Sequence, residues 1–291
     1  IDHSLGMRTL LLPILGGGTW VVMNKFMVSK YCEYIKKYKV TFSVLVANQI
    51  YELLANPIHF KTFHLTKGLV SASAKLFPAA KNKIINKKIN LYEMYGTAEI
   101  GTVTNINLLK NAKYLKSVGK SYHKKIKIRI LSEKNQFLGC GKIGEIVCKT
   151  PGEFKMYLNS KKLNKAAYYK GYFKTGDIGY LNNKGYLFFL SRKKNIIRRS
   201  GISIYPEDIE KVFLKDAQIN EVAVVGKETK LKTNIFLFIK KTKSINETYV
   251  KNICLKKLSK FQLPNKIIFL KKFPKSNLGK INKIKLLSLV H

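Results

Sequence analysis

The order of apolar and polar positions changes character twice along the chain. Over residues 1–110, short apolar runs alternate with amphipathic stretches, which predicts a buried strand at Trp20–Met23, a helix at Tyr31–Tyr38 and a strand at Phe42–Val46. Strands separated by helical patterns are typical of βαβ units around a largely parallel sheet. We therefore expect a doubly wound α/β part in residues 1–110.

The pattern from residue 111 to residue 191 is that of an antiparallel sheet. Ile126–Leu131 alternates with a period of two, and the apolar runs Tyr180–Leu181 and Tyr186–Leu190 flank a turn sequence at Asn182–Gly185. Asn and Gly in such a loop favour a hairpin. We expect a barrel-like antiparallel β part here, which completes a large domain of residues 1–191.

Residues 192–291 have the pattern of a small α+β domain. Pro206 suits the first position of a helix, and Glu207 and Asp208 oppose the helix dipole. After this helix, strands are predicted at Glu221–Val225, Ile235–Ile239 and Ile267–Leu270. A second helix is predicted at Val250–Phe261, before the last of these strands.

Charge is the extreme feature of the composition, with 55 Lys+Arg against 16 Asp+Glu and a net charge of +39. Such a charge is compatible with a nucleic-acid or anionic-membrane binder. Only five of the basic residues are Arg, however, and the Lys residues are spread along the chain together with many Asn and Ile residues, as AT-rich codons would give. We favour compositional bias, and expect the charge to assist binding of anionic ligands such as nucleotides.

Cysteine spacing and hydropathy restrict the class further. Cys32, Cys140, Cys148 and Cys254 form no CxxC pair, which argues against zinc and favours free thiols in a reducing cytoplasm. The longest apolar run, Leu10–Met23, is too short and too broken for a membrane span. Because the first residue is Ile and an apolar run follows almost at once, we expect the chain to begin inside a longer protein.

Four segments carry the chemically distinctive residues. They are Tyr92–Gly101, which contains Tyr-Gly-Thr-Ala-Glu; Tyr172–Asp177, which ends in Thr-Gly-Asp; Ser191–Glu210, which contains an Arg, a Gly and Tyr-Pro-Glu-Asp-Ile-Glu; and Phe273–Ile281, with Pro-Lys-Ser-Asn-Leu-Gly-Lys-Ile. Each segment by itself is only weak evidence of a function. Together, in this order and at these intervals, they closely resemble the adenylate-forming superfamily of acyl-CoA synthetases, luciferases and peptide-synthetase adenylation domains, and the resemblance covers essentially the whole chain.

The resemblance implies a nucleotide site and a magnesium site in the large domain. Tyr95 would lie against adenine, Gly96 would let the backbone approach the nucleotide, and Glu99 would hold Mg²⁺. The family's threonine that contacts the α-phosphate is Ala98 here, so that Thr97 is the candidate substitute. The small-residue loop that borders adenine in the family corresponds to Ser71, Ala72 and Ser73.

The resemblance also assigns residues around the start of the small domain. Asp177 would accept hydrogen bonds from the ribose hydroxyls with help from Arg192. Asn195 stands where the family has the hinge aspartate about which the small domain rotates. Gly201 would line the thiol tunnel, and Lys280 would stabilise the charge that develops as pyrophosphate leaves.

Two family features lie at or beyond the start of the sequence. His3, within a His-x-x-Gly segment, would line the acyl pocket, although a lone His is as often a packed one. The family's Ser/Thr/Gly-rich phosphate loop is not in this sequence and would precede His3. The sequence is thus interpreted as an N-terminally truncated family member, and the chain alone is expected to adenylate poorly.

The hypothesis from these observations is an AMP-forming acid–thiol ligase that uses ATP and Mg²⁺ to activate a carboxylic acid and passes the acyl group to CoA. Apolar residues such as Leu11, Trp20 and Ile50 favour an uncharged acyl tail, as in a fatty acid, but they serve equally as core. A carrier-protein phosphopantetheine is the alternative acceptor. A catalytically inactive relative and a basic nucleic-acid binder are alternatives from other classes, and no specific nucleic acid or transmembrane segment is expected. The oligomeric state and the acid are open.

Overall fold

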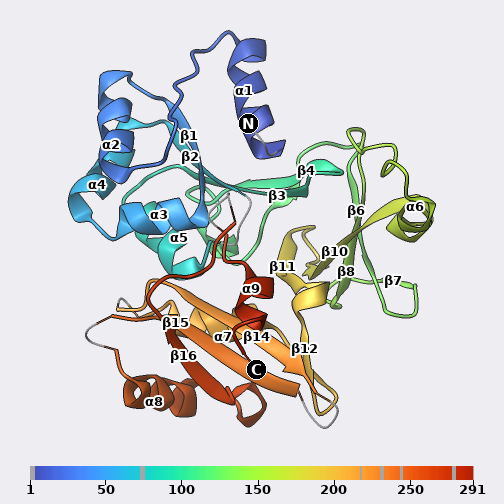
Figure 1. Ribbon diagram of the computed structural model, residues 1–291. Helices are drawn as coiled ribbons and strands as arrows, with labels where there is room; N and C mark the ends of the chain where they lie inside the picture. The colour runs from blue at the N-terminus through green and yellow to red at the C-terminus, as the bar shows by residue number, and fades with distance from the viewer. Residues whose placement is uncertain are drawn as a thin grey trace. The chain divides into compact units, whose positions relative to one another are not determined.

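The computed structural model describes residues 4–72, 76–216, 218–229, 233–242, 245–276 and 280–290. The chain forms two compact units (Figure 1). The larger comprises residues 1–175 and 179–189, and the smaller comprises residues 176–178 and 190–291.

A five-stranded sheet in the order β1-β2-β3-β4-β5 is the centre of the first part of the large unit. β1 and β2 pair in parallel, as do β2 and β3, whereas β4 runs antiparallel to β3 and β5 to β4. The strands are β1 Phe42–Val46, β2 Gly68–Ala72, β3 Leu91–Thr97, β4 Gly101–Asn107 and β5 Lys120–Ser121. The α/β alternation that the sequence predicted is present, but the sheet is mixed: only the pairings among β1, β2 and β3 are parallel, and β4 and β5 add two antiparallel pairings.

Helices α2 Val28–Lys37, α3 Ala47–Leu54 and α5 Pro78–Ile85 pack on this sheet because their apolar stripes need a partner. The same part of the chain also contains α1 Ser4–Gly16, α4 Pro57–Lys61 and 3₁₀ turns at Thr62–Leu65 and Ala112–Tyr114. Ile50 and Leu53 of α3 and Ile84 of α5 are fully buried in a core with Leu69 and Leu91 of the strands. The helix expected at Tyr31–Tyr38 is thus α2.

The strand predicted at Trp20–Met23 is wrong. The apolar run before it forms α1, and Trp20–Met23 has no regular structure, with the Trp20 side chain 38% exposed and that of Val22 52% exposed. A buried strand needs a neighbouring strand for its hydrogen bonds, and within the described chain the sheet ends at β1, which pairs only with β2.

The second part of the large unit is an antiparallel sheet in the order β11-β10-β8-β6-β7, with β9 paired to β10. Its elements are β6 Lys127–Leu131, β7 Phe137–Leu138, β8 Gly144–Lys149, α6 Lys161–Ala167, β9 Tyr168–Tyr169, β10 Tyr172–Leu181 and β11 Leu187–Arg192. The β10–β11 hairpin forms where the turn residues predicted it, because the Asn182 side chain accepts hydrogen bonds from the backbone N–H groups of Lys184 and Tyr186.

The small unit contains a two-stranded ribbon and a three-stranded sheet. The ribbon is β12 Ile197–Arg199 with β13 Ile202–Ile204, after a 3₁₀ turn at Lys193–Asn195, and the sheet is β14 Val222–Glu228, β15 Thr233–Lys240 and β16 Lys266–Leu270. α7 Pro206–Phe213 and α8 Glu247–Lys257 share the core on one face of the sheet with Val224, and α9 Lys283–Leu287 packs on the other face with Ala223 and Val225. Alternate residues of β14 therefore serve two cores.

Helix α8 ends four residues before the predicted limit at Phe261. Leu258 has extended backbone (φ −110°, ψ 147°), and a separate 3₁₀ turn at Lys260–Gln262 follows, in which the Gln262 side chain accepts from the Ser259 backbone. Phe261 is consequently 43% exposed. Within the described residues, no helix has the length and apolar character needed to cross a bilayer.

Candidate functional site

The predicted nucleotide residues of the large unit lie at the ends of two neighbouring strands. Ser71 and Ala72 are the last residues of β2, and Tyr95, Gly96 and Thr97 end β3. In open α/β sheets, the carboxyl ends of parallel strands are where ligands bind. The sheet therefore brings together two segments that are more than twenty residues apart in the sequence.

Tyr95 and Gly96 are held by the close approach of β3 and β4. The Tyr95 ring is 9% exposed and its centroid is 6.2 Å from that of Phe189. The register of the β3–β4 ladder shifts between Tyr95 and Gly96, and a Cβ atom at Gly96 would lie 2.0 Å from the Gly101 carbonyl oxygen. Glycine at this position is thus required by the hairpin itself, in addition to any approach of a ligand.

Two hydroxyl groups at these strand ends are suited to a polar ligand. The hydroxyl oxygens Ser71 Oγ and Thr97 Oγ1 are buried, and neither has a hydrogen-bond partner within the described chain. Because a buried hydroxyl without a partner is costly, such groups call for a bound polar group. Ala98 follows in an exposed turn and offers no side-chain donor, so Thr97 is the hydroxyl available at this point.

Glu99 is anchored by a segment that sequence reasoning did not assign to the site. The Tyr157 hydroxyl donates to Glu99 Oε1 at 3.1 Å, the Phe154 N–H donates to the Glu99 carbonyl at 2.7 Å, and Thr150 Oγ1 donates to the Ile100 carbonyl at 2.9 Å. Burial, together with the charge and hydrogen bond of Glu99, raises the pKa of Tyr157, so the phenol keeps its proton. An oriented carboxylate of this kind is a suitable magnesium ligand.

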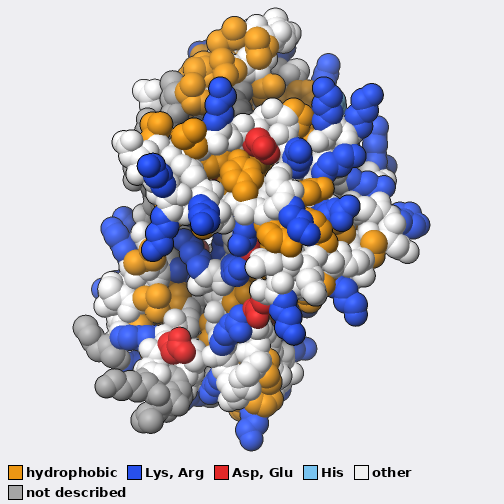
Figure 2. Space-filling view, turned by 90° about the vertical axis from the view of Figure 1, so that its right-hand side faces the viewer, with side chains coloured by type: hydrophobic (Ala, Val, Ile, Leu, Met, Phe, Trp, Pro, Cys, Tyr) orange, Lys and Arg blue, Asp and Glu red, His pale blue; other side chains and the backbone are white. Residues whose placement is uncertain are grey.

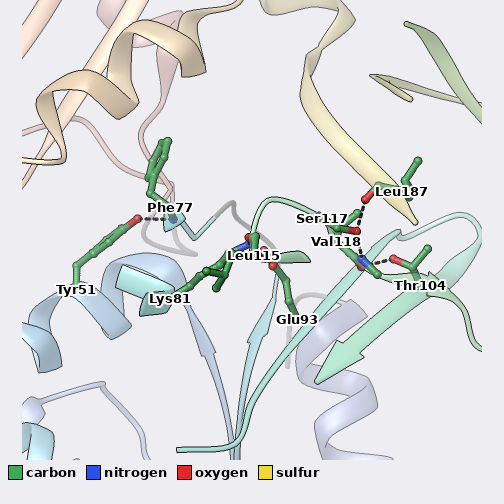
Figure 3. Close-up of polar contacts among 10 residues, drawn as sticks. Tyr51, Phe77, Lys81, Glu93, Thr104, Leu115, Ser117, Val118 and Leu187 are labelled. Carbon is green, nitrogen blue, oxygen red and sulfur yellow. Dashed lines mark hydrogen bonds and ion pairs between the residues drawn. The ribbon is translucent and has the colours of Figure 1, made fainter. Parts of the chain in front are cut away.

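A buried ion pair supports the strand that carries Tyr95 (Figure 3). Lys81 of α5 pairs with Glu93 of β3 and also donates to the Leu115 carbonyl at 2.8 Å, and the side chains of both charged residues are almost fully buried. The Tyr51 hydroxyl accepts from the Phe77 N–H at 3.1 Å, immediately before α5. These contacts hold α5 against β3.

Three predicted residues come together within the small unit. Asp177, 1% exposed, forms an ion pair with Arg192, in which Arg192 Nε lies 2.9 Å from Asp177 Oδ1. Burial and the positive charge of Arg192 lower the pKa of Lys280, and the charge of Asp177 opposes them. Residues about one hundred positions apart in the sequence therefore form one half-buried charged cluster.

Asn195 and Gly201 lie in the connection that leads into the small unit. Asn195 ends the 3₁₀ turn before β12 and borders a cavity of about 280 Å³, together with Arg198 and Lys283. Ser200 and Gly201 both have positive φ (50° and 77°), as the two central residues of a β12–β13 hairpin turn require. No atom lies within 4 Å of a Cβ built at Gly201, so backbone conformation rather than crowding selects glycine in this unit.

Glu207 is a half-buried acid in the first turn of α7. One of its oxygens, Oε2, is buried without a hydrogen-bond partner among the described residues. Burial raises the pKa of Glu207, Lys283 opposes the shift, and the nearby Glu210 adds to it. Since the unfolded chain then loses this proton at a lower pH than the folded chain, stability falls as the pH rises between the two pKa values.

We expect Glu207→Gln to be more stable than the parent near pH 8 and to lose this advantage near pH 3, where the parent carboxyl is largely protonated in both the folded and the unfolded state. Chemical denaturation across this range measures the difference. Glu247→Gln, which removes an exposed acid of α8, is the control and should show no such dependence. A Glu207→Gln gain that does not vary with pH would contradict the burial argument.

Of the predicted site residues, Ser71, Ala72 and Tyr95–Glu99 thus belong to the large unit, and Asp177, Arg192, Asn195, Gly201 and Lys280 to the small one. The sequence pattern places Asp177 in the large domain, whereas residues 176–178 group by their contacts with the small unit. His3 and Ser73 lie outside the described residues.

Comparison with known proteins identifies the family. The family model of AMP-binding enzymes matches residues 1–158, and that of the AMP-binding enzyme C-terminal domain matches residues 208–280. The chain belongs to the AMP-binding enzyme family. The expectation drawn from its four motifs is confirmed.

Several curated members of the family are CoA ligases. A 2-succinylbenzoate–CoA ligase from Listeria monocytogenes is 29% identical over 288 residues, covering 98% of this chain and 59% of the relative. An indoleacetate–CoA ligase from Aromatoleum aromaticum is 25% identical, covering 97% of this chain and 56% of the relative. The chain therefore spans somewhat more than half the length of these AMP-binding enzymes.

Solved structures show the same fold. The o-succinylbenzoate CoA synthetase of Bacillus subtilis in complex with its acyl-adenylate intermediate superposes with a TM-score of 0.86 at 25% identity, covering 98% of this chain and 58% of that chain. The same enzyme with ATP and magnesium ion gives a TM-score of 0.85. The predicted fold class, α/β with a small α+β C-terminal domain, is thereby confirmed.

On the face shown in Figure 2, Lys and Arg side chains are scattered among polar and apolar ones rather than gathered in one patch. This distribution is what compositional bias gives, and it is unlike the concentrated basic surface of dedicated nucleic-acid binders.

Proposed function

We propose that the protein is an AMP-forming acid–thiol ligase of the acyl-CoA synthetase type. In the first step, a carboxylate attacks the α-phosphorus of ATP and forms an acyl-adenylate while pyrophosphate leaves. In the second step, a thiol attacks the acyl carbonyl, the thioester forms and AMP leaves. The observation that carries the proposal is the cluster of Lys280 with Arg192 and Asp177, because it combines a half-buried cation with a fixed carboxylate.

Each group in the small unit has a task in this chemistry. Lys280 would place its ammonium group at the oxygens that gain charge as pyrophosphate leaves, and partial burial strengthens that interaction. Asp177 would accept hydrogen bonds from the two ribose hydroxyls, and its ion pair with Arg192 would hold the carboxylate in place. Asn195 is proposed as the hinge and Gly201 as part of the thiol path.

The large unit would hold the nucleotide and the metal. Tyr95 provides an aromatic wall for adenine, and the hydroxyls of Ser71 and Thr97 are available to polar atoms of the nucleotide. Glu99, held by Tyr157, would ligate Mg²⁺. When bound, Mg²⁺ neutralises phosphate charge. Thr97 thus stands in for the hydroxyl that Ala98 lacks.

The acceptor is proposed to be CoA, because the relatives named above are CoA ligases. The acids after which these ligases are named, 2-succinylbenzoate and indoleacetate, are both aromatic, which supports an aromatic carboxylic acid as the first class to test. A carrier-protein phosphopantetheine is the alternative thiol.

The test is acid-dependent pyrophosphate release by the complete gene product with ATP and Mg²⁺. A panel of aromatic and fatty acids would be assayed with CoA, with a phosphopantetheinylated carrier protein and with neither. Release with one acid and thioester formation with CoA would support the proposal. Thioester on the carrier alone would change the acceptor, and no release with any acid from a folded, AMP-binding protein would identify an inactive family member.

A further inference from the structure

The segment that carries Lys280 is pinned to the sheet of the small unit by one carboxylate. Glu221, directly before β14, lies between two lysines: Lys240 Nζ is 2.9 Å from its Oε1, and Lys275 Nζ is 3.1 Å from its Oε2. The Glu221 side chain is 17% exposed. Burial alone would raise the pKa of Glu221, but its contacts with Lys240 and Lys275 outweigh burial and lower it, so the group is a carboxylate at neutral pH.

The two lysines belong to different parts of the small unit. Lys240 ends β15 and belongs to the sheet itself. Lys275 belongs to the Lys280 segment, in which Lys275 and Ile281 form an antiparallel bridge, the Ser276 N–H donates to the Lys280 carbonyl at 2.8 Å and the Asn282 N–H donates to the Pro274 carbonyl at 2.8 Å. A displacement of Lys275 therefore moves the Lys280 backbone, because backbone hydrogen bonds join the two sides of the segment.

We propose that Glu221 is a positioning residue for Lys280 and acts through Lys275. The inference rests on the proposed function only for the consequence in catalysis, since the placement of Lys280 is a property of the folded chain. Lys280 keeps its half-buried place beside Arg192 as long as Glu221 holds the start of the segment. When the contact is lost, the segment retains its fold but the Lys280 amine gains freedom.

Glu221→Gln and Lys275→Met both remove the contact, and Lys240→Met is the matched control because it removes a lysine from the same carboxylate without touching the Lys280 segment. We expect the first two variants to lower acyl-adenylate formation by about tenfold, a cost typical of a slightly misplaced catalytic group. The double variant Glu221→Gln/Lys275→Met should lose no more than either single one, because both act through one contact. Thioester formation from synthetic acyl-adenylate should change little, and Lys240→Met should resemble the parent.

A second readout needs no catalysis. The pH dependence of Lys280 acetylation by acetic anhydride, followed by peptide mass spectrometry, reports the pKa of this amine. In Glu221→Gln and Lys275→Met it should move up toward that of an exposed lysine, while Lys240→Met leaves it low. This result separates the inference from the ligase proposal, because it is expected even from a protein that adenylates no acid in the panel.

An unchanged titration of Lys280 in Lys275→Met would overturn the inference, as would an equal change in Lys240→Met, since that would make Glu221 a general stabiliser of the sheet. Should Glu221→Gln fail to fold, Lys275→Met decides alone.

Discussion

Lys280→Ala is expected to lower acyl-adenylate formation by about 10²–10³-fold, the usual cost of removing one group that stabilises developing charge. Thioester formation from synthetic acyl-adenylate should be nearly unaffected, because that step no longer expels pyrophosphate. Pyrophosphate release and single-turnover thioester formation in the complete gene product measure the two steps separately. Lys272→Ala is the control, since Lys272 is exposed in the same part of the chain.

The pH dependence of the same step gives a second signature. Because burial and Arg192 lower the pKa of Lys280, the part of the rate that depends on its charge should fall as the pH rises, below the range in which an ordinary lysine loses its proton. Lys280→Ala should lack this limb of the profile. Equal losses in both half-reactions, or a profile unchanged by the substitution, would contradict the role given to Lys280.

Lys81→Met is expected to destabilise the large unit by about 3–5 kcal/mol, which is typical of removing one partner from a buried ion pair. The substitution leaves Glu93 with its charge in the core and deprives the Leu115 carbonyl of a donor. The free energy of unfolding from urea denaturation, followed by far-UV circular dichroism, measures the effect.

The double variant Lys81→Met/Glu93→Gln should regain much of the loss, because no uncompensated charge then remains in the core. Lys83→Met, on the same helix, is the control. A Lys81→Met loss as small as that of Lys83→Met would mean that the pair contributes little, and a double variant less stable than Lys81→Met would mean that Glu93 is stabilised by other contacts.

The sequence predicted most elements of the fold because their patterns are local. Phe42–Val46 forms β1 with the predicted bounds, and Pro206–Phe213 forms a helix whose Ile209 and Phe213 are fully buried, as its apolar stripe requires. The two failures arise where tertiary packing outweighs the local pattern. Trp20–Met23 has strand-like composition but no neighbouring strand within the described chain, and at the end of α8 Leu258 takes an extended backbone and packs against the core of the small unit.

The sequence predicted the motif residues of the candidate site, but not the side chains that hold them in place. Tyr95, Glu99, Asp177 and Lys280 stand in short segments whose order reveals the family, so the sequence alone determined the class of protein. The residues that support them come from elsewhere in the chain. Tyr157 donates a hydrogen bond to Glu99, the Lys81–Glu93 pair holds the strand that carries Tyr95, and Glu221 pairs with Lys275 in the segment of Lys280. In a chain with 55 basic residues, spacing does not single out Lys81 from other lysines, and the motif that contains Lys275 does not name Glu221 as its partner. Only the tertiary structure decided which lysines pair with a carboxylate and that the Lys81–Glu93 pair is buried, because an ion pair depends on distance in space and on exclusion from water, which the order of residues does not determine.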